Sequence, residues 1–107
     1  MSRVLLLDAD EHHAKQIEWA LRSISCQTTT CAETESAISL LHRQRCDVIV
    51  VVCRPGMDWD IRIEFIRHAV IQLPEPPRIV CLMRGPYRGP NERVYAARRG
   101  FKVVYEQ

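Results

Sequence analysis

Acidic residues gather near the start of the chain, directly after a short apolar run. Residues 4–7 are valine and leucine, and Asp8, Asp10 and Glu11 follow, with Ala9 between the two aspartates. Carboxylates at the end of a strand could hold Mg²⁺ or transfer protons. Asp8, as an isolated carboxylate, is a poor Mg²⁺ site, because that ion requires octahedral oxygen ligands. We therefore interpret Asp8 as a residual acid or helix-end partner and predict no metal site.

Two histidines, His12 and His13, come next, in the first turn of a predicted helix. Adjacent residues on a helix point about 100° apart, so the two rings cannot easily bind one metal ion. We predict that both histidines are solvated.

The cysteines give little support for a metal or disulfide framework. Their number is odd and no pair has the CxxC spacing of a zinc site: Cys26, Cys31, Cys46, Cys53 and Cys81. Three of them lie beside or within apolar runs, which is typical of buried, reduced thiols. Reduced thiols fit a cytoplasmic location.

Residues 48–53 form an unbroken apolar run, followed by the turn residues Pro55 and Gly56. Such a run predicts a strand that is buried on both faces in a parallel sheet. Ligands of open α/β sheets collect beyond the carboxyl ends of such strands. This strand ends in valine and cysteine, with no acid, base or hydroxyl group.

Cations concentrate in the last quarter of the chain, where two tyrosines, Tyr87 and Tyr95, interrupt them. The cations are Arg84, Arg88, Arg93, Arg98, Arg99 and Lys102. Three interpretations remain open: a solvated basic face, a face for an acidic protein partner or a second copy, and a nucleic-acid surface. The formal net charge is only +2, which disfavours nucleic acid as the partner of this domain alone.

The length of 107 residues predicts one small domain over residues 1–107. No apolar run approaches the roughly 18 residues of a membrane span. Apolar or β-branched runs at 4–7, 26–31, 48–53, 79–83 and 102–105 predict strands, the second at an edge of the sheet. They alternate with helical patterns that begin near residues 11, 34, 60 and 91, which indicates a three-layer α/β domain with a parallel sheet. In the third helix we expect Ile61, Phe65, Ile66, Ala69 and Val70 to face the core.

Three segments resemble the response-regulator receiver domains of two-component signalling. They are the strand and acids of residues 4–10, Pro55-Gly56-Met57-Asp58, and residues 96–101 with their alanines and glycine. The resemblance implies a flavodoxin-like sheet of five strands in the order 2-1-3-4-5. It also implies a phosphoryl-accepting aspartate after the third strand, a Mg²⁺-binding acidic pair, a hydroxyl after the fourth strand and a lysine after the fifth.

The chain departs from the family at every one of these chemical positions. Asp8 is present, but the other positions carry Ala9, Val51 or Val52, Leu82 or Met83, and Gln107. Valine has no lone pair with which to attack phosphorus. The resemblance therefore implies a degenerate receiver, or pseudo-receiver: a domain that is not an enzyme, has no cofactor, and acts by protein–protein interaction in bacterial signal transduction or transcriptional regulation.

Receivers also have a fifth helix after the last strand, which we expect to be missing or truncated here. Its absence would leave apolar surface for a partner, such as an output domain, a regulator or a second copy in a homodimer. We expect Trp59, where the family has glycine, to pack over the emptied pocket.

Other functions stay possible from the sequence. A phosphorelay receiver could use Asp58 or Asp60 as a non-standard acceptor. A small nucleotide- or flavin-binding domain is disfavoured, because Asp8, Asp10 and Glu11 would repel phosphate from the first loop. A nucleic-acid-binding domain is the remaining alternative.

Overall fold

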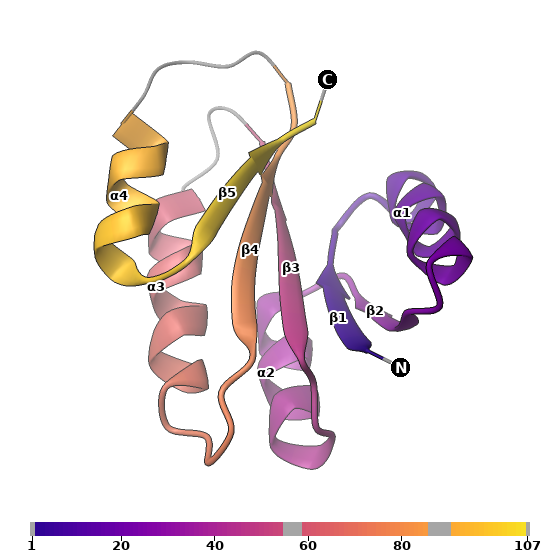
Figure 1. Ribbon diagram of the computed structural model, residues 1–107, viewed down its shortest axis with the longest axis horizontal. Coiled ribbons are helices and arrows are strands. Elements are labelled where there is room, and N and C mark those ends of the chain that lie inside the picture. Colours follow the sequence, from indigo (N-terminus) through magenta and orange to yellow (C-terminus); the bar gives the residue numbers. More distant parts are fainter. Residues whose placement is uncertain (1, 55–58, 86–90, 107) are drawn as a thin grey trace.

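The computed structural model describes residues 2–54, 59–85 and 91–106, which form strands and helices in strict alternation (Figure 1). The strands are β1 (Arg3–Leu7), β2 (Gln27–Cys31), β3 (Val48–Cys53), β4 (Arg78–Met83) and β5 (Lys102–Tyr105). The helices are α1 (Glu11–Ser23), α2 (Thr34–Arg43), α3 (Trp59–Val70) and α4 (Asn91–Arg99). The predicted α/β class and all nine predicted elements are confirmed.

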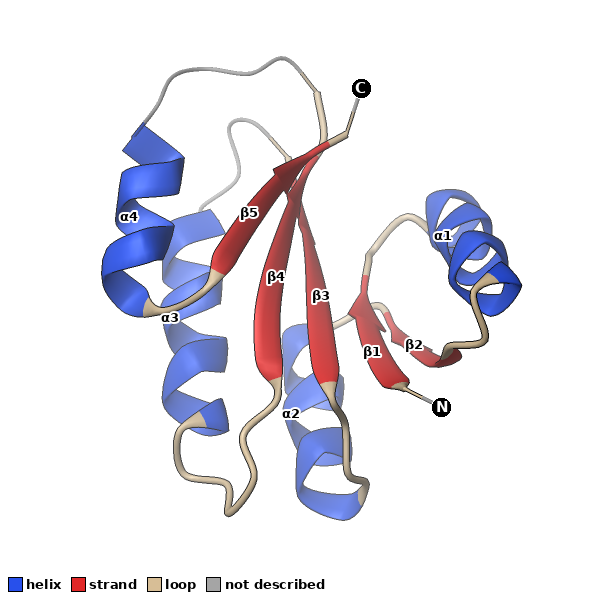
Figure 2. Ribbon diagram, viewed as in Figure 1, coloured by secondary structure: helices blue, strands red, loops and turns tan. Residues whose placement is uncertain are grey.

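The five strands form one parallel sheet in the order β2-β1-β3-β4-β5 (Figure 2). This is the order that the resemblance implied. The polar, threonine-rich β2 lies at one edge of the sheet, as predicted, where one side of its backbone needs no partner strand. Parallel pairing brings the carboxyl ends of all five strands to the same edge, so residues that follow different strands can meet there.

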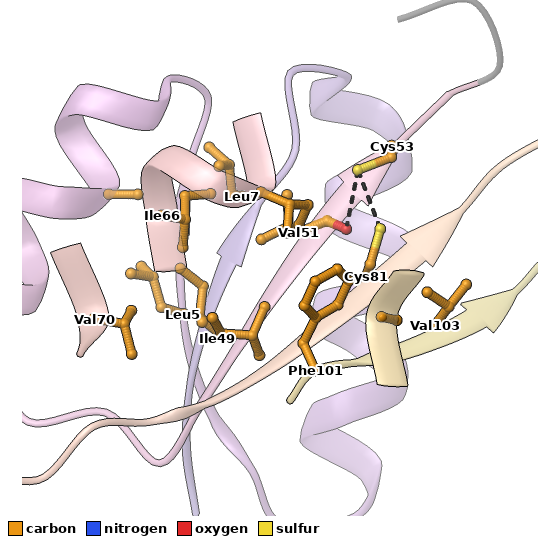
Figure 3. Packing of buried hydrophobic residues seen from close by; sticks show 14 of the residues in the cluster. Leu5, Leu7, Ile49, Val51, Cys53, Ile66, Val70, Cys81, Phe101 and Val103 are labelled. Carbon is orange, nitrogen blue, oxygen red and sulfur yellow. Dashed lines mark hydrogen bonds between the residues drawn. The ribbon is translucent and has the colours of Figure 1, made fainter. Parts of the chain in front are cut away.

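The main core fills the space between one face of the sheet and the helices α2, α3 and α4. Figure 3 shows Leu5, Ile49 and Val51 of the central strands packed against Ile66 and Val70 of α3. These side chains have little or no exposed surface. Burial of this apolar area is the main source of the free energy that holds the sheet to its helices.

The opposite face of the sheet has a much smaller core. Ala14 of α1 packs with Leu6 and Val52, and Val50 and Leu82 are only partly buried beside them. Among the described helices, α1 alone lies on this side, next to the β1 and β2 end of the sheet (Figure 1). We call the two faces of the sheet the α1 side and the α2–α4 side.

The prediction for the buried face of α3 was wrong in part. Ile66 and Val70 are buried, but Ile61 and Phe65 are 65% and 58% exposed, and Ile63 takes their place in the core. Positions 63, 66 and 70 follow the spacing of three and four residues that puts side chains on one helical face. The apolar residues Ile61 and Phe65 lie one turn apart on another face.

The cysteines are free, and Cys53 and Cys81 are fully buried, as predicted, whereas Cys46 is only partly buried. Their Sγ atoms are 3.3 Å apart in the main core (Figure 3). Donation of the Cys81 S–H to Cys53, together with burial, raises the pKa of the Cys81 thiol. No helix among the described residues is long and apolar enough to cross a bilayer.

Candidate functional site

Three charged residues follow the ends of different strands, and their side chains point to the same side of the sheet. Side chains alternate between the two faces along a strand, so Asp8 continues the face of Leu6, Arg84 that of Leu82, and Glu106 that of Val104. Because the strands are parallel, these three ends lie at one edge. Their side chains therefore converge on the α1 side of the carboxyl edge.

The turn from β1 into α1 brings further polar groups to this edge. Asp10 is the N-cap of α1, as predicted, and its Oδ1 accepts a hydrogen bond from the His13 backbone N–H at 3.1 Å. The Asp10 N–H in turn donates to Asp8 Oδ1 at 3.0 Å. These two bonds fix the start of the helix and place His13 in its first turn, above the end of β1.

His13 lies buried between two carboxylates. Its Nδ1 is 2.5 Å from Asp8 Oδ2, and its Nε2 is 2.7 Å from Glu106 Oε2. The histidine and Asp8 are each only 3% exposed. The prediction of two solvated histidines is therefore wrong for His13, while His12 is exposed as predicted. The rotation of about 100° between neighbours turns one ring toward the sheet and the other toward water.

Two arginines complete the arrangement. Arg54 Nη2 and Arg84 Nη1 each lie 3.1 Å from Asp10 Oδ2, and Arg84 Nε is 3.8 Å from Glu106 Oε2. The His13 backbone N–H and the Arg84 guanidinium hold the pKa of the Asp10 carboxyl below its ordinary value. We call the set of Asp8, Asp10, His13, Arg54, Arg84 and Glu106 the polar cluster. Its three carboxylates face two guanidiniums and one imidazole.

Sequence reasoning missed most of this cluster, although a signal was present. His13 lies four residues before Ile17, on the apolar stripe of the helix, and this spacing indicates a shared face. Arg84 and Glu106 each follow, by two residues, an apolar residue of a predicted strand. Alternation would have placed them beyond Leu82 and Val104 on one face.

The two candidate acceptor positions point to opposite sides of the sheet. Val51 belongs to the main core of the α2–α4 side, whereas Val52 packs with Leu6 and Ala14 on the α1 side. Val52 is thus the valine that shares a face with Asp8. In the same way, Leu82 lies on the α1 side and Met83 on the α2–α4 side. Neither Val52 nor Leu82, the two of these residues on the α1 side, could act as a nucleophile toward phosphorus.

The other predicted positions of the phosphoryl site add no acid or cation. Ala9 is exposed, and Gln107 lies outside the described residues. Each oxygen of Asp8 already accepts a hydrogen bond from within the chain. In the part of the chain that the structure describes, no three His, Cys, Asp or Glu side chains are arranged to hold a metal ion.

The cations of the predicted basic face make different contacts in the structure. Arg84 belongs to the polar cluster, and the Arg93 guanidinium lies over the Tyr105 ring at 5.0 Å. Arg99 stacks on Tyr95 at 3.6 Å and pairs with Glu64 of α3 at 2.8 Å, which ties α4 to α3. Arg98 and Lys102 are exposed. That these cations bind a partner stays a prediction.

Several predictions fall outside what the structure describes. Asp58, Tyr87 and Arg88 are not among the described residues. The side chains of Trp59 and Asp60 are not described either, so the packing of Trp59 over the pocket stays untested.

Comparison with solved structures identifies the fold. A response regulator from Thermotoga maritima matches with a TM-score of 0.82 and 14% identity, over 99% of this chain and 85% of the other. Vibrio cholerae chemotaxis protein CheY4 matches with a TM-score of 0.77 and 18% identity, over 99% and 87% of the two chains. The pseudo-receiver domain of the CikA protein matches with a TM-score of 0.71 and 16% identity, over 100% and 86%.

Neither a protein-family model nor a curated protein sequence matches this chain. The structural likeness at low identity establishes that the chain has the receiver fold. The activity has to be argued from the side chains at the carboxyl edge of the sheet.

Proposed function

We propose that this chain is a receiver-like signalling domain that takes no phosphoryl group and acts by binding another protein in bacterial signal transduction or transcriptional control. Support comes from the receiver fold, from the similarity to a pseudo-receiver domain, and from the polar cluster. The cytoplasm, where the proteins of such pathways meet, is the location we propose for it.

The observation that carries the proposal is the replacement of an open acidic pocket by a set of internal ion pairs. Val52 is 4% exposed and apolar on the side of the sheet where Asp8 lies. Asp8 is bound to His13, and Asp10 to two arginines. Among the described side chains of this edge, a phosphoryl donor would meet neither a free nucleophile nor a free pair of carboxylates for Mg²⁺.

Incubation with acetyl phosphate and Mg²⁺, followed by intact-mass measurement, tests the absence of phosphoryl transfer. We expect no added phosphoryl mass under conditions that modify a receiver with its acceptor aspartate intact. A hydroxylamine-sensitive adduct on the wild-type chain would overturn the proposal. Repeating the reaction with the variants Asp58→Asn, Asp60→Asn and Asp8→Asn would then identify the acceptor.

The surface we propose for the partner is the α1 side of β3, β4 and β5. Val50, Val80 and Leu82 are only partly buried there, and Val104 is 39% exposed. Arg78 and Lys102 continue the same face of β4 and β5 by alternation, and both are exposed. An apolar strip bordered by cations suits a partner with apolar and acidic residues. Two copies facing each other through this surface would bring like charges together.

Sedimentation equilibrium over a wide concentration range tests the alternative of a second copy. The variant Val104→Glu changes the proposed surface, and Phe65→Glu changes an exposed apolar residue of α3 as a matched control. We expect the wild type to remain monomeric, because of the like charges. Self-association that Val104→Glu abolishes and Phe65→Glu preserves would make the second copy the partner. Self-association lost only in Phe65→Glu would move the interface to α3.

One observation bears on the nucleotide-binding alternative. A helix N-terminus after the first strand is where phosphate binds in nucleotide-binding α/β domains. Here the Asp10 carboxylate already occupies the N–H of His13 at the start of α1, with Asp8 beside it. These anions oppose phosphate binding at this end of the helix.

A further inference from the structure

The geometry of the polar cluster points to a proton-binding switch, and we propose that protonation of His13 controls whether the end of β5 is fastened to α1. This inference does not depend on the identity of any partner. It rests on the contacts of His13, on the different exposure of its two carboxylate partners, and on the second position available to Glu106.

The number of hydrogen bonds that the His13 ring can donate depends on its protonation state. An ionised carboxylate can only accept hydrogen bonds, and a neutral imidazole has one N–H. Both ring nitrogens of His13 lie within hydrogen-bonding distance of a carboxylate oxygen, at 2.5 Å and 2.7 Å. With both carboxylates ionised, both contacts are hydrogen bonds only when His13 is the imidazolium. In that state the charges of the polar cluster balance.

When His13 loses a proton, it loses the hydrogen bond to Glu106 and keeps the one to Asp8. The Asp8 side chain is 2% exposed and cannot turn to water, whereas that of Glu106 is 38% exposed. The single remaining N–H therefore stays on Nδ1, where it continues to satisfy the buried Asp8 carboxylate. The lone pair of Nε2 then faces the carboxylate of Glu106, and the two repel each other.

The Glu106 carboxylate has an alternative partner nearby. Arg84 Nε lies 3.8 Å from Glu106 Oε2, so the carboxylate can turn to this guanidinium or to water. Arg84 already holds Asp10 at 3.1 Å, and Arg54 holds the same oxygen. The other groups facing His13 are Asp8 and Asp10 at the β1–α1 turn, and the α1 neighbours Ala14 and Ile17 are apolar. Among the described residues, the His13 ring has no other hydrogen bond that could replace the one to Glu106.

The consequence is a movement coupled to pH at the end of a strand. His13 and Glu106 are 93 positions apart, so their bond joins the start of α1 to the end of β5. Imidazole is the side chain whose charge ordinarily changes between about pH 5 and 8. At acidic pH Glu106 is fastened to α1, and as the pH rises the proton passes to water and the end of β5 is released from the helix.

Nuclear magnetic resonance of the full chain tests the switch. Long-range ¹H–¹⁵N spectra distinguish the imidazolium from each neutral tautomer of His13, and backbone spectra report on Tyr105 and Glu106. We expect His13 to change from the imidazolium to the Nδ1–H tautomer as the pH rises. The amides of Tyr105 and Glu106 should shift with the same midpoint.

Two variants and one matched control make the test decisive. In Glu106→Gln the His13 ring should still titrate, while the coupled shift of the Tyr105 amide disappears. In His12→Gln, which changes the exposed neighbour, both transitions should persist. A His13 ring that keeps one protonation state from about pH 5 to 9, whether imidazolium or a neutral tautomer, would overturn the proposal. A Tyr105 transition that survives in Glu106→Gln would overturn it as well.

Discussion

The two faces of the sheet differ in how completely their side chains are buried and in how many polar groups they carry. The α2–α4 side is a closed apolar core in which Val51, Cys53 and Cys81 have no exposed surface. The α1 side has one small apolar cluster, partly exposed valines, and the six side chains of the polar cluster at its carboxyl edge. The larger apolar core therefore lies on the α2–α4 side, and the surface that we propose for a partner lies on the α1 side.

The largest effect should come from a charge placed in the closed face. In Val51→Asp a carboxylate enters the main core among apolar side chains and buried thiols. We expect the free energy of unfolding to fall by about 3 kcal/mol or more, the usual cost of an uncompensated buried charge. Urea unfolding measures it.

The matched substitution on the α1 side is Val104→Asp, at a residue that is 39% exposed. Its cost should be about 1 kcal/mol or less, because water reaches the new carboxylate. Equal losses in the two variants would mean that the faces do not differ in the way described here.

A second effect comes from the two adjacent histidines. In His13→Ala the buried carboxylate of Asp8 loses its hydrogen-bond partner, and we expect a loss of about 3 kcal/mol, because a buried carboxylate is left unpaired. The matched control His12→Ala removes an exposed ring from the same helical turn and should change stability by about 0.5 kcal/mol or less. Thermal or urea unfolding of both variants gives the comparison, and similar stabilities would contradict the burial of His13.

The sequence predicted the fold well because its signals were local. Unbroken apolar runs marked β1, β3 and β4, and the alternation with helical patterns required a parallel sheet. The buried face of α3 was harder, because Ile61, Phe65 and Ile63 are all apolar and hydrophobicity alone cannot choose among them. The α2–α4 core accepts Ile63 and leaves the other two in water.

The polar cluster could not be predicted as a unit, because its members come from four separate stretches of the chain: residues 8–13, Arg54, Arg84 and Glu106. The resemblance to receivers drew attention to the positions that lack phosphoryl chemistry, and so to Val51, Val52 and Gln107. It did not point to His13 or Glu106, whose contact spans nearly the whole chain. Only the parallel register, which carries Glu106 to the side of α1, makes that bond visible.

The smallest expected effect is the contribution of the ionised Asp10 carboxylate to the free energy of unfolding at acid pH. The pKa of Asp10 is lowered in the folded chain by the His13 N–H and by Arg84, so the ionised carboxylate favours folding. This contribution is fully present above the unfolded pKa of Asp10 and disappears as the pH falls through the lower, folded value.

In Asp10→Asn the contribution is absent at every pH, because the amide does not ionise. Urea unfolding at a series of pH values from neutral to acid should therefore show a shallower loss of stability in Asp10→Asn than in wild type. Asparagine remains a good N-cap, so the helix start is preserved and the difference reports on charge. Parallel curves for the two proteins would show that Arg54 and Arg84 leave the Asp10 carboxylate without net stabilisation.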